Sequence, residues 1–309
     1  MRIKAPSRLH ITLIDLNSEI GRVDGGIGLA LELPFIEIEA KKSDVFSIRG
    51  KYKERTEQVA KKFIELVGLA KAGVELEVTK SFEEHTGLGM GTSLTLSTCK
   101  AISELYKLNL SGNEIASLMG RGSTSGIGTA GFEHGGFILD GGHSIEAKPD
   151  FLPSSASKAK PAPVLVRHDF PDWKIAIVIP KGIKVHGSGE VNIFKTHCPI
   201  PRNEIEKLSH TILMKVLPAV VEKDISAFGA GITEIQKIGF KQIEVNLQSN
   251  KVREILKKCQ ELSYGAGLSS FGPAIYCIVE DEDKLREEVG REAKIIFTKA
   301  NNTGAKVFN

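Results

Sequence analysis

Alternating apolar and polar positions mark the first fifty residues of the chain. Residues 9–14 alternate in this way, and residues 33–40 alternate apolar with acidic side chains. A period of two predicts β-strands with one buried face. The segment 17–31 between them contains three closely spaced glycines, so we expect a turn or a close backbone approach there. Arg22 and Asp24 are expected to project from that loop, either toward a site or as a solvated hairpin.

Further along the chain, apolar residues recur at the spacing of a helix instead of alternating with polar ones. Ser111 and Glu114 have the spacing of a capping box, which predicts a helix start at that point. The remaining segments are short apolar runs and amphipathic stretches. We predict helices over 56–69, 94–108, 111–119, 204–216, 224–236, 251–262 and 282–292, and strands over 74–78, 137–139, 173–179, 274–280 and 294–298.

The order of these segments predicts an α+β protein in which helices pack on a sheet. Residues 149–163 are rich in Pro, Ser and Lys, which is typical of a loop or linker. We therefore expect one domain over 1–160 and a second over 161–309. No internal repeat or heptad pattern is present.

Composition narrows the class of protein that this sequence can encode. The chain has 309 residues, 41% hydrophobic and 26% charged, as expected for a globular protein with real cores. A net charge of +3 is too small to argue for nucleic acid. The 4 cysteines are far apart and lack a C-x-x-C pair, which argues against zinc and for a reducing compartment. Without a signal peptide or a long apolar run, we expect a cytoplasmic protein.

One stretch carries candidate chemistry, HTGLGMGTSLTLS at residues 85–97. Gly87, Gly89 and Gly91 alternate along it, Thr92 and Ser93 follow, and a helix is predicted next. A glycine-rich turn opening a helix suits an anion, because the backbone can approach closely and the first helical N–H groups lack partners. The pattern is neither Walker A nor G-x-G-x-x-G. A plain N-capped turn remains the alternative.

Three motifs in this order resemble the GHMP kinase superfamily: residues 5–16 (APSRLHITLIDL), the glycine stretch, and residues 265–279 (GAGLSSFGPAIYCIV). In that comparison His85 stands where the family has proline. The resemblance implies a two-domain fold, with an N-terminal half like domain 2 of ribosomal protein S5 and a ferredoxin-like C-terminal α/β sandwich.

The mevalonate-type kinases of this superfamily have T-P-S-G-I-D where this chain has STSGIG at residues 123–128. Gly128 therefore replaces their catalytic aspartate, and a glycine cannot orient or deprotonate an attacking hydroxyl. The chain as a whole resembles the β-ribofuranosylaminobenzene 5′-phosphate synthase family. That resemblance implies condensation of phosphoribosyl pyrophosphate with 4-aminobenzoate or 4-hydroxybenzoate, release of CO₂ and pyrophosphate in methanopterin biosynthesis, Mg²⁺ as cofactor, and a homodimer.

Such a reaction requires sites for two anionic groups and cations against the departing pyrophosphate. The second anion loop is expected at residues 265–272 or 186–189. By resemblance, the loop with Arg22 and Asp24 faces the acceptor ring and the ribose. The predicted catalytic residues are Asp24, Arg22, His10 and Arg8, and the predicted phosphate-binding residues are Gly87, Gly89, Gly91, Thr92, Ser93, Ser269, Ser270 and Gly272. Further candidates are Arg121, Lys195, Asp15 and His134.

Two other functions stay open at this point. An ATP-dependent small-molecule kinase would need a base from elsewhere, such as Asp24, and would release ADP. A binding protein, for example for RNA, is disfavoured by the modest charge and the lack of clustered aromatic residues. A steep salt dependence of RNA affinity would favour it again. A histidine taken singly, such as His10 or His134, is more often a core or capping residue than a catalytic one.

Overall fold

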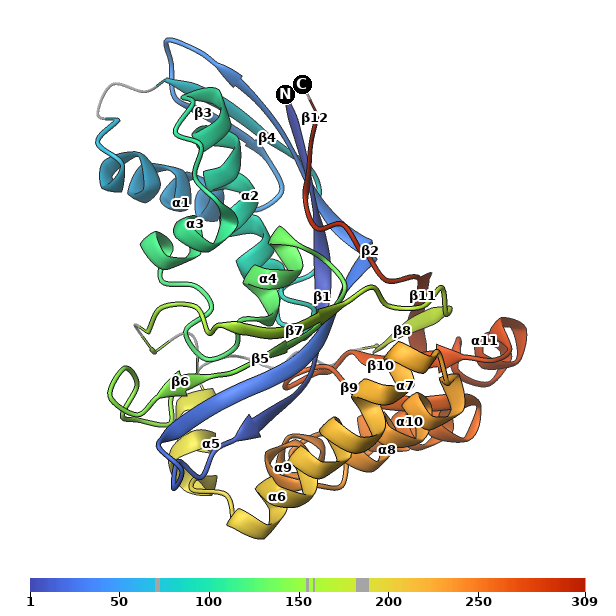
Figure 1. Cartoon of the computed structure of the whole chain (residues 1–309). Helices are drawn as coiled ribbons and strands as arrows, with labels where there is room; N and C mark the ends of the chain where they lie inside the picture. The colour runs from blue at the N-terminus through green and yellow to red at the C-terminus, as the bar shows by residue number, and fades with distance from the viewer. Residues whose placement is uncertain (70–72, 154–155, 158, 182–188, 309) are drawn as a thin grey trace.

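Two sheets organise the protein, which is described here from a computed structural model covering residues 1–69, 73–153, 156–157, 159–181 and 189–308 (Figure 1). The larger sheet has the order β12-β1-β2-β4-β3, with β5 and β6 also pairing with β2, and β7 pairing with β5. Its strands are β1 (Arg2–Asp15), β2 (Arg22–Lys42), β3 (Ser47–Gly50), β4 (Val74–Lys80), β5 (Phe137–Asp140), β6 (His143–Ser144), β7 (Val164–His168) and β12 (Lys306–Phe308).

The smaller sheet has the order β11-β8-β10-β9 and is antiparallel throughout. Its strands are β8 (Ile175–Pro180), β9 (Ser263–Leu268), β10 (Ile275–Val279) and β11 (Ala293–Thr298). The mixture of helices and sheets confirms the predicted α+β class. The predicted boundary at 160/161 stays a prediction; β7 and β12, which both follow it, pair with β5 and β1 of the larger sheet.

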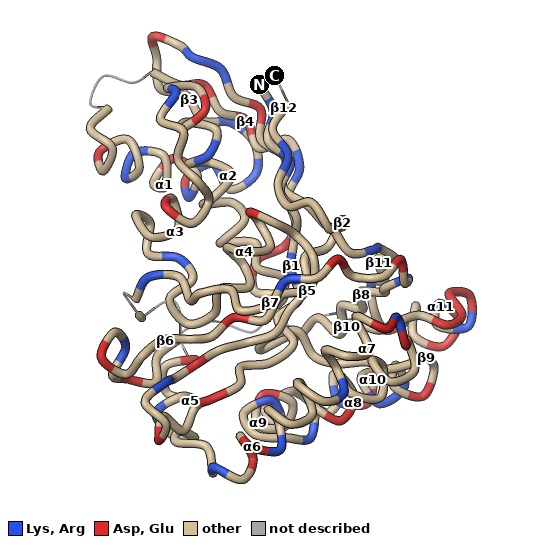
Figure 2. Tube along the Cα trace, in the orientation of Figure 1, with Lys and Arg blue, Asp and Glu red and all other residues tan. Residues whose placement is uncertain are grey.

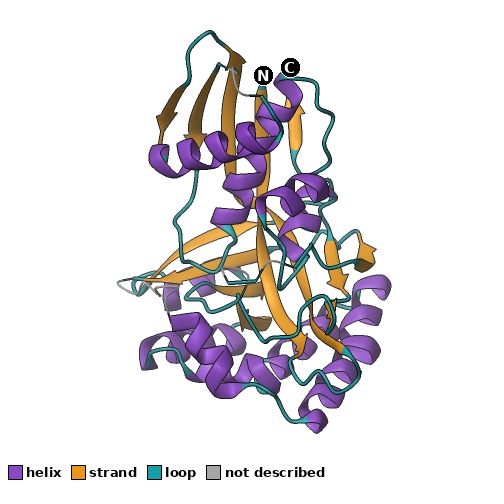
Figure 3. Cartoon of the chain, turned by 90° about the vertical axis from the view of Figure 1, so that its left-hand side faces the viewer, coloured by secondary structure: helices purple, strands orange, loops and turns teal. Residues whose placement is uncertain are grey.

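The helices form two groups (Figures 1 and 3). One lies beside the larger sheet, and the other surrounds the smaller sheet and reaches the ends of β1 and β2, where Phe194 packs with Leu13 and Val23. The first group comprises α1 (Lys53–Leu66), α2 (Met90–Leu105), α3 (Gly112–Met119) and α4 (Ile127–Glu133). The second comprises α5 (Glu190–His197), α6 (Arg202–Thr211), the π-helix η2 (Ile212–Val216), α7 (Leu217–Glu222), α8 (Ile225–Ile235), α9 (Gly239–Asn246), α10 (Asn250–Glu261) and α11 (Glu282–Val289).

The prediction that Arg22 and Asp24 lie in a loop was wrong. β2 begins at Arg22, and Asp24 lies opposite Asp15 of β1 in the antiparallel ladder. β6 pairs with Arg22 and Val23 on the other side, and this distant partner cannot be read from the local sequence. The expected close approach does occur at Gly28, where an added Cβ would lie 2.4 Å from the carbonyl oxygen of Leu9. Glycine is therefore required at Gly28.

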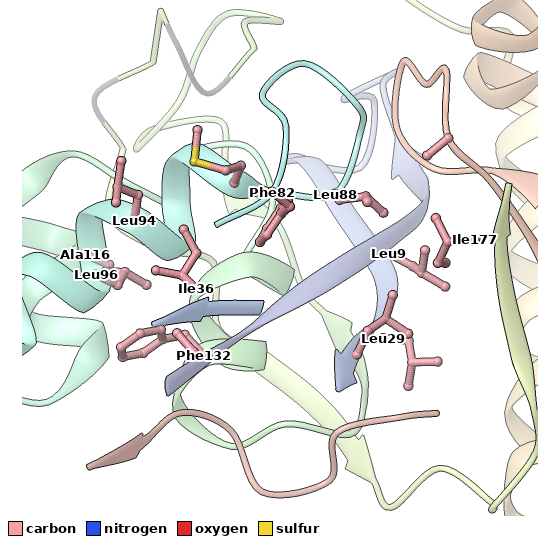
Figure 4. Packing of buried hydrophobic residues seen from close by; sticks show 14 of the residues in the cluster. Leu9, Leu29, Ile36, Phe82, Leu88, Leu94, Leu96, Ala116, Phe132 and Ile177 are labelled. Atoms are coloured by element: carbon pink, nitrogen blue, oxygen red, sulfur yellow. The ribbon is translucent and has the colours of Figure 1, made fainter. Parts of the chain in front are cut away.

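The core joins the two sheets. Leu9 and Leu29 of the larger sheet and Ile177 of the smaller sheet are almost fully buried in one cluster (Figure 4). On its other face the smaller sheet packs against α10 and α11. Because one core lies between the sheets, the loops where the two halves meet are held in a fixed relation, and the cavity described below is formed there.

Charge does not gather on one side of the molecule: Figure 2 shows basic and acidic residues interspersed along the whole chain. None of the helices that the structure describes is both long enough and apolar enough to cross a membrane.

Candidate active site

The glycine stretch forms a turn at the start of α2. Gly87 and Gly89 have φ of +84° and +79°, a backbone conformation that favours glycine. The carbonyl of Gly89 accepts the N–H groups of Thr92 and Ser93, so α2 begins four residues before its predicted start. The N–H groups of Met90 and Gly91 consequently have no acceptor inside the helix. They point out of the positive end of a 16-residue helix.

A cavity of about 220 Å³ opens in front of this turn. The C-terminal glycine loop forms its opposite wall through Ser270 and Gly272. Both loops predicted to hold anions therefore line one cavity. They are bonded together, because the Ser269 hydroxyl donates to the Gly87 carbonyl at 2.7 Å. The complete lining is Arg8, Arg55, Glu84, His85, Gly87, Gly89, Met90, Gly91, Thr92, Arg121, Glu190, Ser270, Phe271 and Gly272.

Three arginines face this cavity from different parts of the chain. The Arg8 side chain, on β1, donates to the Gly87 carbonyl. Burial lowers the pKa of Arg8 to about 10, and the charges of Glu190 and Glu244 act in the opposite direction, so Arg8 stays charged at neutral pH. A half-buried cation at a glycine turn favours binding of an anion.

Arg55, on the first turn of α1, forms an ion pair with Glu84. Its guanidinium lies against the start of α2, where a Cβ on Gly91 would be 2.5 Å from Nη2. Burial and the nearby charge of Arg55 lower the pKa of Arg121. In the part of the chain that the structure describes, no hydrogen bond or ion pair engages the Arg121 guanidinium. Two like charges thus line the same cavity, and Glu84 is paired with only one of them.

Two of the predicted phosphate ligands use their hydroxyl groups inside the protein. Ser93 is buried, and its hydroxyl donates to the Pro6 carbonyl at 2.8 Å. Ser269 is also buried and, besides binding Gly87, accepts the His10 backbone N–H at 3.1 Å. Thr92 and Ser270 line the cavity instead. The geometry therefore favours Thr92 and Ser270 over Ser93 and Ser269 as hydroxyl donors to a ligand.

His10 is buried, and neither of its ring nitrogens has a hydrogen-bond partner among the residues that the structure describes. A Cβ added to Gly26 would lie 3.4 Å from both His10 Nε2 and the Ser125 hydroxyl oxygen, so these two atoms approach the same small space. Burial, with the charges of Arg8 and Lys241, lowers the pKa of His10 well below its ordinary value. The imidazole is therefore neutral and able to accept a hydrogen bond.

Arg22 and Asp24 lie elsewhere, along a second and largely apolar groove. The Arg22 guanidinium donates to the carbonyls of Gly141 and Gly142 at 2.7–3.0 Å. The groove and the arginine-lined cavity share no lining residue. The structure thus brings Arg8 together with the phosphate loop, but does not place Arg22 or Asp24 in the same cavity.

Asp24 is 1% exposed and sits in a buried ionic cluster. The Lys148 ammonium donates to both of its carboxylate oxygens at 2.9–3.0 Å and to the Thr124 hydroxyl at 2.9 Å. His143 Nδ1 lies 2.7 Å from the same carboxylate, and its Nε2 lies 2.9 Å from the Lys160 carbonyl. His143 thus bridges the Asp24 carboxylate and the Lys160 carbonyl. Through Thr124, this cluster holds the segment 123–128.

Asp140 fixes the same segment through two bonds. Its carboxylate accepts the Gly126 backbone N–H at 2.9 Å and the Ser125 hydroxyl at 3.3 Å. The segment ends at Gly128 beside the phosphate loop, where an added Cβ would lie 3.2 Å from Cγ2 of Thr92. The position at which related kinases carry an aspartate is therefore next to the anion cavity, but in this chain it offers no functional group.

Sequence reasoning missed Arg55, Glu84 and Glu190, which line the cavity from α1, the loop before α2, and α5. No local motif marks them, and their shared position appears only once the chain is folded. Of the remaining candidates, Lys195 and His134 are exposed and line neither the cavity nor the groove. Asp15 accepts backbone N–H groups at the turn after β1. The predicted loop at 186–189 lies outside the described residues except for Gly189.

This combination of fold and glycine turn defines a GHMP-kinase-like protein. The GHMP kinases N terminal domain model matches residues 54–136, and the GHMP kinases C terminal model matches residues 216–294. A crystal structure of a mevalonate kinase superposes with a TM-score of 0.71 at 18% identity, covering 98% of this chain and 99% of that one. A homoserine kinase from Cytophaga hutchinsonii gives 0.67 at 16% identity, covering 100% and 97%. At these identities the likeness concerns the fold.

Closer relatives define the particular family. The chain is 48% identical to the beta-ribofuranosylphenol 5′-phosphate synthase of Archaeoglobus fulgidus, covering 99% of both chains. It is 48% identical to that of Methanocaldococcus jannaschii, covering 100% of both, and 42% identical to that of Methanothermobacter thermautotrophicus, covering 98% and 97%. The chain belongs to this family of enzymes, as the sequence resemblance predicted.

Proposed function

We propose that this protein joins C1 of phosphoribosyl pyrophosphate to the ring carbon that bears the carboxylate of a 4-substituted benzoate. Identity of 42–48% to three synthases over nearly the whole chain is the observation that carries the proposal. Their name describes a phenol bearing a ribofuranosyl 5′-phosphate, which favours 4-hydroxybenzoate over 4-aminobenzoate as the acceptor. The enzyme would then be a pentosyltransferase that forms a C-riboside and acts in methanopterin biosynthesis.

The reaction balances in two steps. The bond between C1 and the pyrophosphate oxygen breaks, and pyrophosphate leaves with the electron pair while positive charge develops at C1. The ring carbon that carries the carboxylate donates an electron pair to C1, helped by the hydroxyl or amino group on the opposite side of the ring. Loss of CO₂ then returns the pair of the C–CO₂⁻ bond to the ring and restores aromaticity. The protein must bind the departing pyrophosphate and orient the ring.

The arginine-lined cavity supports the first requirement. Arg8, Arg55 and Arg121 supply positive charge, and the N–H groups at the start of α2 supply donors with fixed direction. Such preorganised groups stabilise charge that develops on a leaving group without reorganising during the step. The neutral His10 of β1, whose Nε2 approaches the same small space as the Ser125 hydroxyl, is our candidate for contacting the sugar or the acceptor's ring substituent.

The residues present are compatible with Mg²⁺ carried by the substrate. No group of three or more His, Cys, Asp or Glu side chains able to hold a metal converges anywhere in the described ranges. The cavity has two carboxylates, Glu84 and Glu190, and the hydroxyl of Thr92. Mg²⁺ in phosphate-transfer sites is commonly held by one or two carboxylates and substrate phosphates, with waters completing the shell. Glu190 would hold the ion, which when bound neutralises phosphate charge.

A kinase of the same superfamily is the alternative, and Gly128 argues against it. The position next to Thr92 offers no carboxylate to act on an acceptor hydroxyl. Asp24, considered as a replacement base, is fully engaged with Lys148 and His143. We therefore expect no ADP formation from ATP with any small alcohol.

The test is incubation of the purified protein with phosphoribosyl pyrophosphate, Mg²⁺ and carboxyl-labelled 4-hydroxybenzoate or 4-aminobenzoate. We expect labelled CO₂ and pyrophosphate in equal amounts, with none when phosphoribosyl pyrophosphate is omitted. A parallel incubation with ATP and a panel of alcohols measures ADP. Robust ADP release without CO₂ would overturn the proposal. Light scattering of the purified protein tests the homodimer that we also propose.

A further inference from the structure

We infer that Arg55 and Arg121 form the subsite for the diphosphate end of phosphoribosyl pyrophosphate, and that this diphosphate replaces Glu84 as the partner of Arg55. The inference rests on the proposed function and deepens it, because it fixes the direction in which the substrate lies. The diphosphate occupies the end of the cavity at α2. The ribose and its 5′-phosphate lie toward Ser270 and Gly272.

The first support is electrostatic. Arg121 lies within the influence of the Arg55 charge, which together with burial lowers its pKa. Two guanidinium groups brought together in a partly buried place repel each other unless an anion lies between them. Glu84 supplies one negative charge and is already bonded to Arg55. Arg121 has no ion-pair partner among the residues that the structure describes, so positive charge remains unbalanced at this point.

The second support is positional. The Arg55 guanidinium lies against the backbone of Gly91, one residue into α2. A ligand held by Arg55 therefore also meets the free N–H groups of Met90 and Gly91. Backbone donors at a helix start, together with guanidinium groups, are the usual means of binding phosphate oxygens. The helix start does not stand alone, because Arg55 of α1 lies against it and Arg121, which follows α3, lines the same cavity.

Charge also decides which end of the substrate lies here. A diphosphate carries more negative charge than a phosphate monoester, and it develops still more as it leaves C1. Arg55 and Arg121 line the cavity with the start of α2, and Arg8 packs against Gly89 of the same turn, whereas Lys241, which donates to the Ser270 carbonyl, is buried and paired with Glu244. The stronger cationic end therefore matches the leaving group.

Glu84 makes the subsite selective. A weakly charged anion must displace a carboxylate from Arg55 to bind, and this lowers its net affinity. A diphosphate gains contacts with Arg55, Arg121 and the helix N–H groups at once. The ion pair between Arg55 and Glu84 therefore discriminates against simple phosphate in favour of pyrophosphate.

Calorimetric binding of inorganic pyrophosphate and of ribose 5-phosphate to the whole protein tests the direction of the substrate, without need of turnover. We expect Arg55→Ala and Arg121→Ala each to weaken pyrophosphate binding about 10- to 100-fold, the range for a lost charge-assisted contact. Ribose 5-phosphate binding should change less than about threefold. Arg55→Lys and Arg121→Lys, which keep the charge, should recover part of the affinity. The matched control is Arg49→Ala, an exposed arginine on β3 outside the cavity.

Thermal unfolding of each variant shows that it is folded before binding is measured. Unchanged pyrophosphate affinity in folded Arg55→Ala and Arg121→Ala would overturn the inference. So would a selective loss of ribose 5-phosphate binding, because that outcome reverses the substrate in the cavity. Neither result depends on which acceptor the enzyme uses, so this inference can fail while the proposed function stands. If pyrophosphate binds as expected but no CO₂ is released, the proposed function fails and the subsite stands.

The role of Glu84 has its own measurement. Glu84→Gln should raise the affinity for inorganic phosphate about tenfold while changing that for pyrophosphate less, so the preference for pyrophosphate falls. The neighbouring, exposed Glu83→Gln is the matched control and should leave both affinities unchanged. Equal effects of the two variants would show that Glu84 acts only through its contribution to the overall charge and not through its ion pair with Arg55. That result would overturn this part of the inference.

Discussion

Two buried carboxylates hold the segment 123–128 against the phosphate loop. Asp24 acts through Lys148 and Thr124, and Asp140 acts through the backbone of Gly126. From sequence, Asp24 was a candidate acid–base residue because it stands beside glycines and near an N-terminal motif. Its burial and its two partners could not be foreseen, because Lys148 and His143 are more than a hundred residues away.

Asp24→Asn should therefore act mainly on stability. Removing the charge leaves Lys148 buried without its counter-ion, which typically costs roughly 3–5 kcal/mol in the free energy of unfolding. Urea denaturation measures this cost, and the double variant Asp24→Asn with Lys148→Met should recover part of it. If the single variant keeps wild-type stability while kcat falls about 100-fold, Asp24 is a catalytic group after all, as the sequence hypothesis held.

Asp140 gives the protein a pH-dependent stability. Burial raises its pKa from 3.8 to about 6 in the folded state, so the folded chain holds this proton more tightly than the unfolded chain. The contribution of Asp140 is thus fully present below about pH 4 and is lost as the pH rises through 6. A shift of this size corresponds to roughly 3 kcal/mol.

The comparison that isolates this effect is wild type against Asp140→Asn, because other carboxylates titrate identically in both. From pH 4 to pH 7 the unfolding free energy of the wild type should fall by roughly 3 kcal/mol relative to the variant. Urea denaturation at several pH values measures the difference. A constant difference across this range would contradict the account of Asp140.

At the scale of elements, the long periodic segments were predicted well, whereas several short segments without a clear period were missed. α1, α8, α10 and the capping box of α3 lie within a few residues of their predicted bounds. β9 was missed because its sequence SYGAGL lacks a strand pattern. Its Gly265 packs directly on the backbone of Gly229 in α8, and such a contact between distant segments leaves no local period. α4, α5, α9 and β7 were missed as well, being short and without a clear pattern.

The start of α2 yields a prediction at the same scale. A Val at Gly91 would place its Cβ 2.5 Å from Arg55 Nη2, so the flexible arginine must move and the helix need not. We expect Gly91→Val to raise the KM for phosphoribosyl pyrophosphate at least about tenfold with the fold intact. Asn113→Val, at the matching second position of α3, exposed and outside the cavity, is the matched control. Normal binding in the Gly91 variant would indicate a purely structural turn.

At the scale of the whole molecule, the candidate site draws on almost the entire chain, from Arg8 on β1 to Gly272 before β10. The motifs predicted the phosphate loop and its facing glycine loop, because each is continuous in sequence and keeps its local chemistry. They could not predict that Arg55 and Glu190 join them, since single residues on amphipathic helices look like solvated surface. The placement of Arg22 along a separate groove likewise follows from the β-ladder rather than from its neighbours in sequence.

A crystal structure with phosphoribosyl pyrophosphate bound, without acceptor, tests the central claim most directly. We predict the diphosphate at the start of α2, bonded to the N–H groups of Met90 and Gly91 and to Arg55 and Arg121, with Glu84 released from Arg55. The ribose should lie toward Ser270. A diphosphate bound in the groove beside Arg22, or a substrate lying in the opposite direction, would contradict the account.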